Sequence, residues 1–168
     1  MFQKILVANR GEIAIRVMRA ANELGKRTVA VYAEEDKLGL HRFKADEAYR
    51  IGEGLGPVAA YLSIPEIIRV AKASGADAIH PGYGFLAENA EFARRVNAAG
   101  IRFVGPTPEA LALLGDKIAA KARAREVGVP VLEGTLGATS LEEAQDFFAA
   151  LPAGTAMLIK AIAGGGGR

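Results

Sequence analysis

Short segments rich in valine and isoleucine alternate with amphipathic segments over the first hundred residues, and this alternation constrains the fold more than any other feature. Five segments have the apolar, β-branched character of buried strands: residues 4–8, 28–33, 48–52, 76–80 and 102–105. Helical periodicity occurs between some of them, over residues 12–24, 64–74 and 88–99. Strands that alternate with helices are joined by crossover connections and pair in parallel. The sequence therefore predicts an α/β fold with a Rossmann-like parallel sheet.

Three glycines support this order of elements. Gly25, Gly75 and Gly100 each follow a predicted helix by about one residue. A helix commonly ends with a residue in the left-handed conformation, which glycine adopts without steric cost. These positions therefore mark the expected ends of the three helices.

The pattern changes after residue 106. Thr107-Pro108 has the features of a helix start, and Gly115-Asp116 indicates a break followed by a second helix over 117–127. We then expect a helix near 140–151, a strand over 156–162 and a glycine-rich loop. The predicted boundaries are a first domain over residues 1–106, linker helices over 107–128 and an incomplete subdomain over 129–168. Because the chain stops inside a loop, we expect it to be a piece of a longer protein.

Composition excludes several classes of function. Lys and Arg total 21, Asp and Glu total 19, and the two signs are interspersed, so the sequence predicts neither a nucleic-acid partner nor a membrane partner. The chain has no cysteine, which excludes disulfides, cysteine-based zinc sites and thiol nucleophiles. The apolar run near Met1 is too short for a signal peptide. We expect a cytoplasmic protein.

The predicted strand over residues 156–162 carries the first candidate site. Lys160 shares a strand face with Leu158 and Ile162, where an ammonium group needs an anion to offset its desolvation. Gly164, Gly165, Gly166 and Gly167 follow, and backbone amides without side chains can approach a phosphate closely. A lysine that reaches solvent beside a flexible linker explains the same residues equally well.

Two further segments are candidate sites. Lys117 opens a helix, where its charge opposes the helix dipole unless an anion lies nearby, although a solvated lysine is the simpler interpretation. Residues 80–89 leave the carboxyl end of a predicted strand, the edge where open α/β sheets bind ligands. They offer His80, Tyr83 and Glu88, and a turn with a core histidine and a helix start is the competing interpretation.

The predicted helix after Asn9-Arg10-Gly11 has a charged stripe opposite its apolar stripe. The charged stripe consists of Glu12, Arg16, Arg19 and Glu23 at helical spacing. Glu12 with Arg16, and Arg19 with Glu23, are spaced for intrahelical ion pairs. A solvated face and a subunit interface both fit this pattern.

Taken in order, these motifs resemble the opening of biotin carboxylases, members of the ATP-grasp superfamily. The residues that carry the resemblance are 4–14 (KILVANRGEIA), 80–89 (HPGYGFLAEN), Gly105-Pro106, Gly115-Asp116-Lys117 and 160–168 (KAIAGGGGR). They span nearly the whole chain, which makes the resemblance more specific than a single glycine loop. Residues 32–46 (YAEEDKLGLHRFKAD), together with 47–49, 56–57 and 60–62, look closest to the pyruvate carboxylases within this family.

The resemblance implies a pre-ATP-grasp domain, linker helices and an incomplete ATP-grasp lid. It implies an ATP-dependent ligase that uses Mg2+ and bicarbonate, forms carboxyphosphate, and carboxylates biotin held on a separate biotin carboxyl carrier domain. Lys117, Lys160 and Gly164 to Gly167 match nucleotide-binding positions, and Tyr83 and Glu88, in the motif that begins at His80, match positions lining the active site. Arg16, Arg19 and Glu23 match a region used in carboxylase dimers, so a homo-oligomer is expected for the complete protein.

The same resemblance places the main catalytic residues and the metal ligands beyond Arg168. We therefore expect no metal site in these residues and no turnover by the chain alone, which would need the C-terminal part of the carboxylase as a partner. One departure is Thr155-Ala156, where the family commonly has an aromatic residue and proline.

Three alternatives stay open. One is a subunit of an acetyl-CoA or other acyl-CoA carboxylase, another is a different ATP-grasp ligase, and the third is a non-catalytic dimerisation module. A nicotinamide-binding domain is disfavoured because residues 8–12 lack its glycine spacing.

Overall fold

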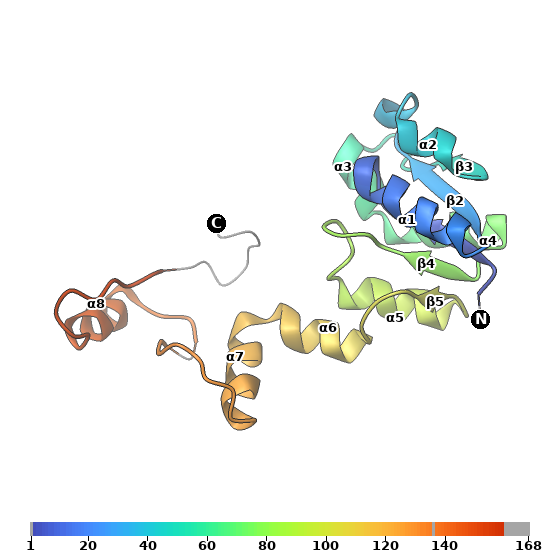
Figure 1. Ribbon diagram of the computed structural model, residues 1–168. Coiled ribbons are helices and arrows are strands. Elements are labelled where there is room, and N and C mark those ends of the chain that lie inside the picture. Colours follow the sequence, from blue (N-terminus) through green and yellow to red (C-terminus); the bar gives the residue numbers. More distant parts are fainter. Residues whose placement is uncertain (1, 136, 160–168) are drawn as a thin grey trace. The chain divides into compact units, whose positions relative to one another are not determined.

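The computed structural model describes residues 2–135 and 137–159, and the chain divides into two compact units, Met1–Ala112 and Leu113–Arg168 (Figure 1). The strands are β1 (Lys4–Val7), β2 (Arg27–Tyr32), β3 (Glu47–Arg50), β4 (Ala78–His80) and β5 (Arg102–Phe103). The helices of the first unit are α1 (Gly11–Glu23), the 3-10 helix η1 (Glu34–Asp36), α2 (Leu40–Lys44), α3 (Pro57–Leu62), α4 (Ile64–Ser74) and α5 (Ala90–Ala98). Three more helices follow: α6 (Pro108–Gly115), α7 (Lys117–Glu126) and α8 (Leu141–Ala149).

The five strands form one parallel sheet in the order β3-β2-β1-β4-β5. The predicted α/β fold is thereby confirmed, as are all five predicted strands, with ends that differ by up to two residues. Gly25, Gly75 and Gly100 all have positive φ angles between 67° and 75°, so each ends its helix as expected.

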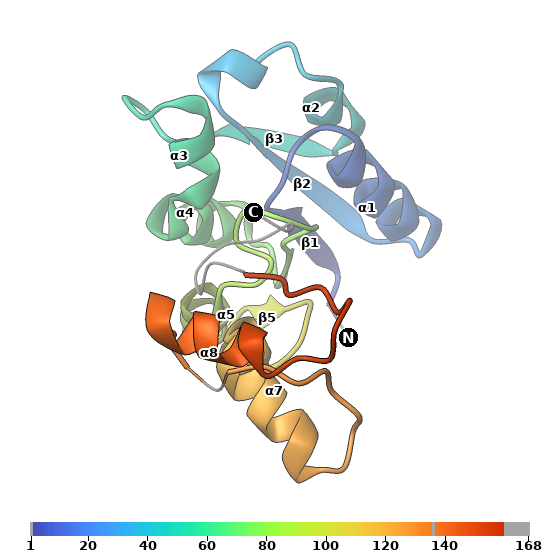
Figure 2. The ribbon, with the colours of Figure 1, turned by 90° about the vertical axis from the view of Figure 1, so that its left-hand side faces the viewer.

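Alternation along the strands divides the core between two helical layers. Leu6 and Ile79 face the layer that contains α4 and α5, where Val70 and Phe92 are fully buried. Val7 and Ala30 point the other way and pack against Met18 of α1. Figure 2 shows α3 and α4 on one side of the sheet and α1 on the other. The two-residue period of the strands thus produces a sheet covered on both faces.

Three short elements were not predicted from the sequence: η1, α2 and α3. Each spans six residues or fewer, which is too short for helical periodicity to be visible. Tertiary contacts stabilise them instead. In α2, His41 is 1% exposed and its Nε2 atom lies 3.2 Å from the Val31 carbonyl oxygen, while Tyr61 of α3 is fully buried.

The second unit contains the predicted helices but not the start of the predicted strand. Ser140 begins α8 with a reciprocal capping box, in which its side chain and that of Glu143 each bind the other residue's backbone amide. Residues 156–159 have no strand conformation, so the strand expected over 156–162 is wrong for these four residues. A strand needs a hydrogen-bonded partner, and no strand is found among residues 113–135 and 137–159 that could provide one.

Candidate functional site

The topological switch point of the sheet lies between β1 and β4. From β1 the chain proceeds outward to β2 and β3, and it then returns to β4 on the other side of β1. The loops that leave the carboxyl ends of β1 and β4 therefore diverge, which opens a crevice of the kind that binds ligands in open α/β sheets. Residues 8–10 and 81–89 form these two loops.

Asn9 joins the two loops. Its Nδ2 atom donates hydrogen bonds to the carbonyl oxygens of Pro81, at 2.7 Å, and Tyr83, at 2.9 Å. Its Oδ1 atom accepts a hydrogen bond from the Arg10 amide at 2.9 Å. Asn9 is only 3% exposed, so the loss of these bonds would leave buried polar groups unpaired. The conformation of the β4 loop thus depends on a side chain at the end of β1.

Positive φ angles allow the β4 loop to turn at this point. Gly82 has φ +69° and Gly84 has φ +66°, which glycine adopts at little cost. Phe85 has φ +40°, which is rare for a bulky side chain and indicates local strain. Such strain persists only where the surrounding contacts hold the residue in place.

Arg10 and Tyr61 provide the contacts that hold Phe85 in place. The Phe85 ring stacks on the Tyr61 ring with centroids 5.1 Å apart, and the Arg10 guanidinium lies 5.6 Å from the centroid of the first and 5.5 Å from that of the second. Arg10 Nη1 also forms an ion pair with Asp36 Oδ2 at 3.1 Å. Stacking and cation-π contacts therefore attach the β4 loop to α3, and the ion pair of Arg10 connects the same cluster to η1.

The Tyr61 hydroxyl group forms two hydrogen bonds. The Tyr61 hydroxyl donates to Asp36 Oδ2 at 2.7 Å and accepts from the Ala33 amide at 3.3 Å. Burial, followed by the hydrogen bond to the Asp36 carboxylate, raises the pKa of Tyr61 well above its usual range. The phenol is therefore neutral at physiological pH and acts as a hydrogen-bond donor.

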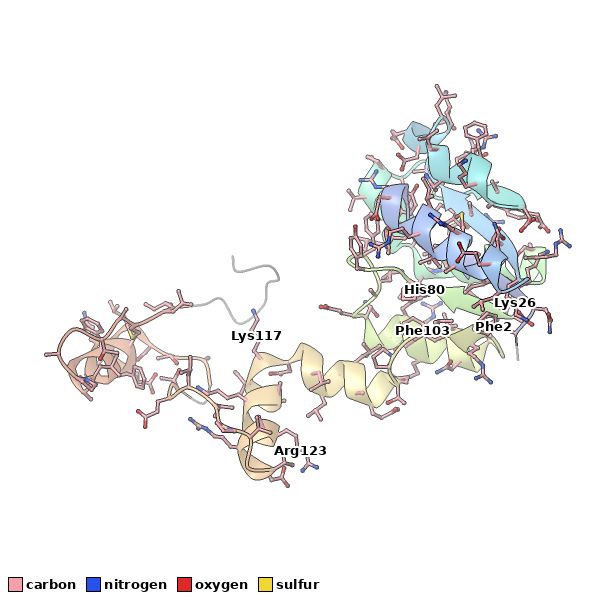
Figure 3. All side chains as sticks on the ribbon, viewed as in Figure 1. Phe2, Lys26, His80, Phe103, Lys117 and Arg123 are labelled. Carbon is pink, nitrogen blue, oxygen red and sulfur yellow. The ribbon has the colours of Figure 1, made fainter. Side chains whose placement is uncertain are left out.

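His80, a predicted site residue, lies at the end of β4 and is labelled in Figure 3. Its Nδ1 atom accepts a hydrogen bond from the Gly82 amide at 2.9 Å, so the proton of the neutral ring is on Nε2. Burial lowers the pKa of His80. The neutral imidazole therefore helps to fix the first turn of the loop.

Tyr83, the second predicted residue, borders an open crevice of about 300 Å3 at this edge of the sheet. The crevice is lined by Asn9, Arg10, Glu12, Ile13, Tyr83, Gly84 and Phe85. The Tyr83 side chain is 62% exposed, and its hydroxyl donates to Glu12 Oε2 at 3.3 Å. Glu88, the third predicted residue, is exposed in the turn before α5 and does not line this crevice.

Lys117 is the first residue of α7, as predicted, and is exposed (Figure 3). Asp116 caps this helix by accepting hydrogen bonds from the amides of Ile118, at 2.8 Å, and Ala119, at 3.0 Å. These two amides are therefore occupied by the cap. Lys160 and Gly164 to Gly167, the other predicted nucleotide-binding residues, lie outside the described residues.

The charged stripe of α1 forms the two predicted intrahelical pairs. Arg16 Nη1 lies 3.3 Å from Glu12 Oε1, and Arg19 Nε lies 3.0 Å from Glu23 Oε1. All four side chains are more than 60% exposed, so these pairs contribute little to stability. Arg16, Arg19 and Glu23 are therefore accessible on the surface of the first unit.

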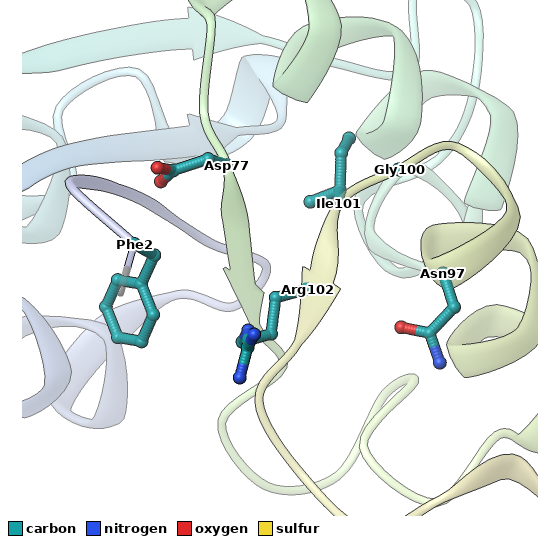
Figure 4. A pocket seen from close by; sticks show the side chains of 6 residues that line it. All are labelled: Phe2, Asp77, Asn97, Gly100, Ile101 and Arg102. Carbon is teal, nitrogen blue, oxygen red and sulfur yellow. The ribbon is translucent and has the colours of Figure 1, made fainter.

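A larger depression of about 500 Å3 lies near the amino ends of β4 and β5 (Figure 4). The Asp77 carboxylate in it accepts from the amides of Gln3 and Lys4, and Asn97 Oδ1 accepts from the Phe103 amide. These oxygens hold the starts of β1 and β5, so the depression has an evident structural role.

Neither a metal cluster nor a membrane span is found in the described parts of the chain. No three His, Asp or Glu side chains in residues 2–135 and 137–159 gather as potential ligands of a metal ion. Over the same residues, no helix has the length and apolar character needed to cross a bilayer.

Sequence reasoning missed Asp36 and Tyr61 as parts of the site, and it included Phe85 only as a member of the 80–89 segment. Asn9 and Arg10 were visible as a motif after a strand, and their position at the switch point could have indicated their role. Asp36 and Tyr61 are 25 residues apart and share no sequence pattern with the β4 loop. Only folding brings them together.

Comparison with known proteins gives a consistent result. A family model described as "Biotin carboxylase, N-terminal domain" matches residues 1–111. Mitochondrial pyruvate carboxylase of Mus musculus is 58% identical over 99% of this chain, and pyruvate carboxylase of Bacillus subtilis is 55% identical over the same share. The chain spans 14% of the length of each of these relatives.

Solved structures extend the likeness. A Hydrogenobacter thermophilus 2-oxoglutarate carboxylase, solved as a biotin carboxylase domain dimer with MgADP and bicarbonate, matches all of this chain with a TM-score of 0.92 and 48% identity. The match covers 36% of that chain. Rhizobium etli pyruvate carboxylase matches 80% of this chain with a TM-score of 0.78 and 62% identity, over 14% of its own length.

Proposed function

This chain belongs to the family of biotin carboxylase N-terminal domains, and from that premise we propose that it is the N-terminal part of an enzyme that carboxylates protein-linked biotin with ATP and bicarbonate. The proposed reaction class is that of an ATP-dependent ligase. We propose that the carboxyl group passes in the complete protein to pyruvate, giving oxaloacetate.

One observation carries this proposal. The likeness to the 2-oxoglutarate carboxylase domain extends over the whole chain, past the residues that match the family model. That structure contains MgADP and bicarbonate. ADP is the product of ATP, one of the two proposed substrates, and bicarbonate is the other. The switch-point crevice adds independent support, because it is where the physics of an open α/β sheet favours a ligand.

The proposed roles are those that the resemblance to the family implies. Lys117 would contact the nucleotide phosphates through its ammonium group, and Lys160 with Gly164 to Gly167 would complete that site. His80, Tyr83 and Glu88 would line the active site, with His80 acting on the loop through Gly82. We propose that the Mg2+ ligands and the main catalytic residues lie beyond Arg168.

When ATP is bound, it supplies the phosphoryl group that activates bicarbonate. The residues described here fit one part of that requirement, since Lys117 offers an exposed cation at a capped helix start. Cation-phosphate contacts are a common way to hold a nucleotide. A separate biotin carboxyl carrier domain and the rest of the carboxylase are the proposed partners.

The curated relatives favour pyruvate as the acceptor, since pyruvate carboxylases from animals, fungi and bacteria are 54–58% identical to this chain. The likeness to a long-chain acyl-CoA carboxylase supports a second candidate acceptor, an acyl-CoA. It matches 89% of this chain with 52% identity and a TM-score of 0.84. Comparing pyruvate with acyl-CoA as the acceptor, in the protein that carries this chain, distinguishes the two.

We also propose a homo-oligomer in which Arg16, Arg19 and Glu23 contact a second copy. Their exposure on α1 supports this role, and the 2-oxoglutarate carboxylase relative was solved as a domain dimer. A folded, non-catalytic dimerisation module stays the alternative for the 168 residues by themselves. We propose a cytoplasmic location for the protein.

The test of the proposed function is ATP hydrolysis by the full-length protein that carries this chain. We expect phosphate release that requires both bicarbonate and biotin, and oxaloacetate formation when pyruvate is added. The 168-residue chain alone should release no phosphate above background under the same conditions. Hydrolysis by the full-length protein that ignores bicarbonate and biotin would refute the proposal.

A further inference from the structure

The ion pair between Arg10 and Asp36 lies beside the switch-point crevice and has no role in the function proposed above. Asp36 Oδ2 is shared between two donors, Arg10 Nη1 at 3.1 Å and the Tyr61 hydroxyl at 2.7 Å. Asp36 belongs to η1, Tyr61 to α3, and Arg10 follows β1. One carboxylate oxygen thus joins three segments that are distant in the sequence.

Arg10 and Tyr61, the two donors, also contact the loop that follows β4. Tyr61 and Arg10 both contact the Phe85 ring, which stabilises a residue held at φ +40°. The Arg10 amide is bound by Asn9 Oδ1, while Asn9 Nδ2 holds the carbonyls of Pro81 and Tyr83. Phe85, at the strained end of the loop, therefore connects to Asp36 through one residue, either Arg10 or Tyr61. The turning end connects to Asp36 through two residues, Asn9 and Arg10.

We propose that Asp36 is a positioning residue, which acts through Arg10 and Tyr61 to hold the Pro81–Phe85 loop, and with it Tyr83, in the conformation that receives a carboxylation substrate. This inference rests on the proposed function. Tyr83 and Arg10 line the crevice and Asp36 does not, so Asp36 affects substrate binding only through the residues that it holds in place.

A loop fixed in advance loses less conformational entropy when the ligand binds, which favours affinity. Weakening the contacts of Asp36 with Arg10 and Tyr61 should therefore raise the apparent KM for the substrate that the loop contacts. The ATP site should stay unchanged, because Lys117 belongs to a different unit of the chain. A role in stability alone would instead lower the amount of active enzyme, and so reduce kcat with no selective change in KM.

The experiment uses the full-length carboxylase that carries this chain, with Asp36→Asn and Asp36→Ala variants. Asparagine keeps an oxygen acceptor without the charge, whereas alanine removes both. We expect Asp36→Ala to raise the KM for free biotin or for bicarbonate by about 5- to 10-fold, with a smaller rise for Asp36→Asn. The KM for ATP should stay within about twofold of wild type.

Glu35→Gln is the matched control, because Glu35 is an exposed carboxylate in the same 3-10 helix. It should leave all three KM values unchanged. Tyr61→Phe, which removes one hydroxyl and keeps the stacked ring, provides a second variant if Asp36→Ala does not fold. We expect it to raise the same KM as Asp36→Asn does.

Hydrogen exchange reports on the loop independently of turnover. The Gly82 amide, which is bound to His80, should exchange faster in Asp36→Asn and Tyr61→Phe than in Glu35→Gln. Unchanged exchange and unchanged KM values for biotin and bicarbonate would overturn the inference, as would a loss of kcat alone. A wild-type enzyme that shows no dependence on bicarbonate or biotin would instead reject the proposed function itself.

Discussion

A β-carbon on residue 82 would lie 2.6 Å from the Nδ2 atom of Asn9, closer than two non-bonded heavy atoms normally approach. The same Nδ2 atom binds the carbonyls on both sides of Gly82, those of Pro81 and Tyr83. The absence of a side chain at position 82 therefore allows the β4 loop to wrap around Asn9. The end of β1 and the β4 loop depend on each other for their conformations.

Gly82→Ala should accordingly destabilise the chain by about 3 kcal/mol, part from the left-handed backbone and part from the clash with Asn9. Gly84→Ala is the matched control, because Gly84 has a similar φ of +66° and no atom within 4 Å of an added β-carbon. It should cost only about 1 kcal/mol. Urea unfolding measures both, and equal losses would contradict the proposed contact.

Asn9→Asp should destabilise the chain strongly, although the asparagine and aspartate side chains have nearly the same size. The substitution replaces the buried Nδ2 donor with an oxygen that faces two carbonyl oxygens, and it introduces a charge at a residue that is 3% exposed. We expect a loss of about 3 kcal/mol or more in the free energy of unfolding. Asn22→Asp, on the exposed surface of α1, should change stability by less than about 0.5 kcal/mol.

Stability should fall when the two histidines become protonated. Burial lowers the pKa of His80 and of His41 below the ordinary value of 6.5. The unfolded chain then binds protons more readily, so the stability associated with the neutral rings is fully present above pH 6.5 and is lost as the pH falls through the folded-state pKa. The free energy of unfolding should therefore decrease with falling pH in the window below 6.5.

His80→Asn and His41→Gln test this dependence with little change in hydrogen bonding. The asparagine oxygen can replace Nδ1 as acceptor for the Gly82 amide, and the glutamine nitrogen can replace Nε2 near the Val31 carbonyl. Each variant should have a shallower dependence of unfolding free energy on pH than wild type below pH 6.5. An unchanged slope in the double variant would show that neither histidine contributes.

Asp116→Ala should loosen the start of α7. Asp116 accepts hydrogen bonds from two amides of the first turn, and loss of such a cap costs about 1 kcal/mol. Asp116→Ser, which keeps a capping oxygen, should retain most of the stability. Hydrogen exchange at the amides of Ile118 and Ala119 should be faster in the alanine variant and nearly unchanged in the serine variant.

Arg19→Glu should weaken self-association if α1 contacts a second copy. The reversal removes the pair with Glu23 and places two like charges on one exposed helical turn. Sedimentation of the full-length protein should show a rise of about tenfold or more in the dissociation constant of the oligomer. Arg94→Glu reverses a comparable i,i+3 pair on α5 and should leave association unchanged.

The order of the elements could be read from the sequence because their signals are local. Alternating apolar residues predicted the five strands, and glycines with left-handed backbones ended α1, α4 and α5 where expected. The intrahelical pairs of α1 followed from the spacing of Glu12 with Arg16 and of Arg19 with Glu23. Such features depend on residues within about four positions of each other.

The strand expected from residue 156 shows where local signals are insufficient. Residues 156–159 have a suitable composition, but a strand is stable only beside a partner, and composition cannot provide one. The short helices α2 and α3 are the opposite case. Their sequences carry no clear periodicity, and buried contacts of His41 and Tyr61 stabilise them.

The sequence by itself determined the α/β architecture, the switch-point motifs after β1 and β4, and the family to which the chain belongs. Only the tertiary structure decided that Asn9 would bind both sides of Gly82 and that Asp36 would join Arg10 to Tyr61. The physical reason is the range of the interactions. Hydrogen bonds between side chains and loops 25 to 74 residues apart leave no periodic pattern in the sequence, because they arise only when the parallel strands bring their ends together.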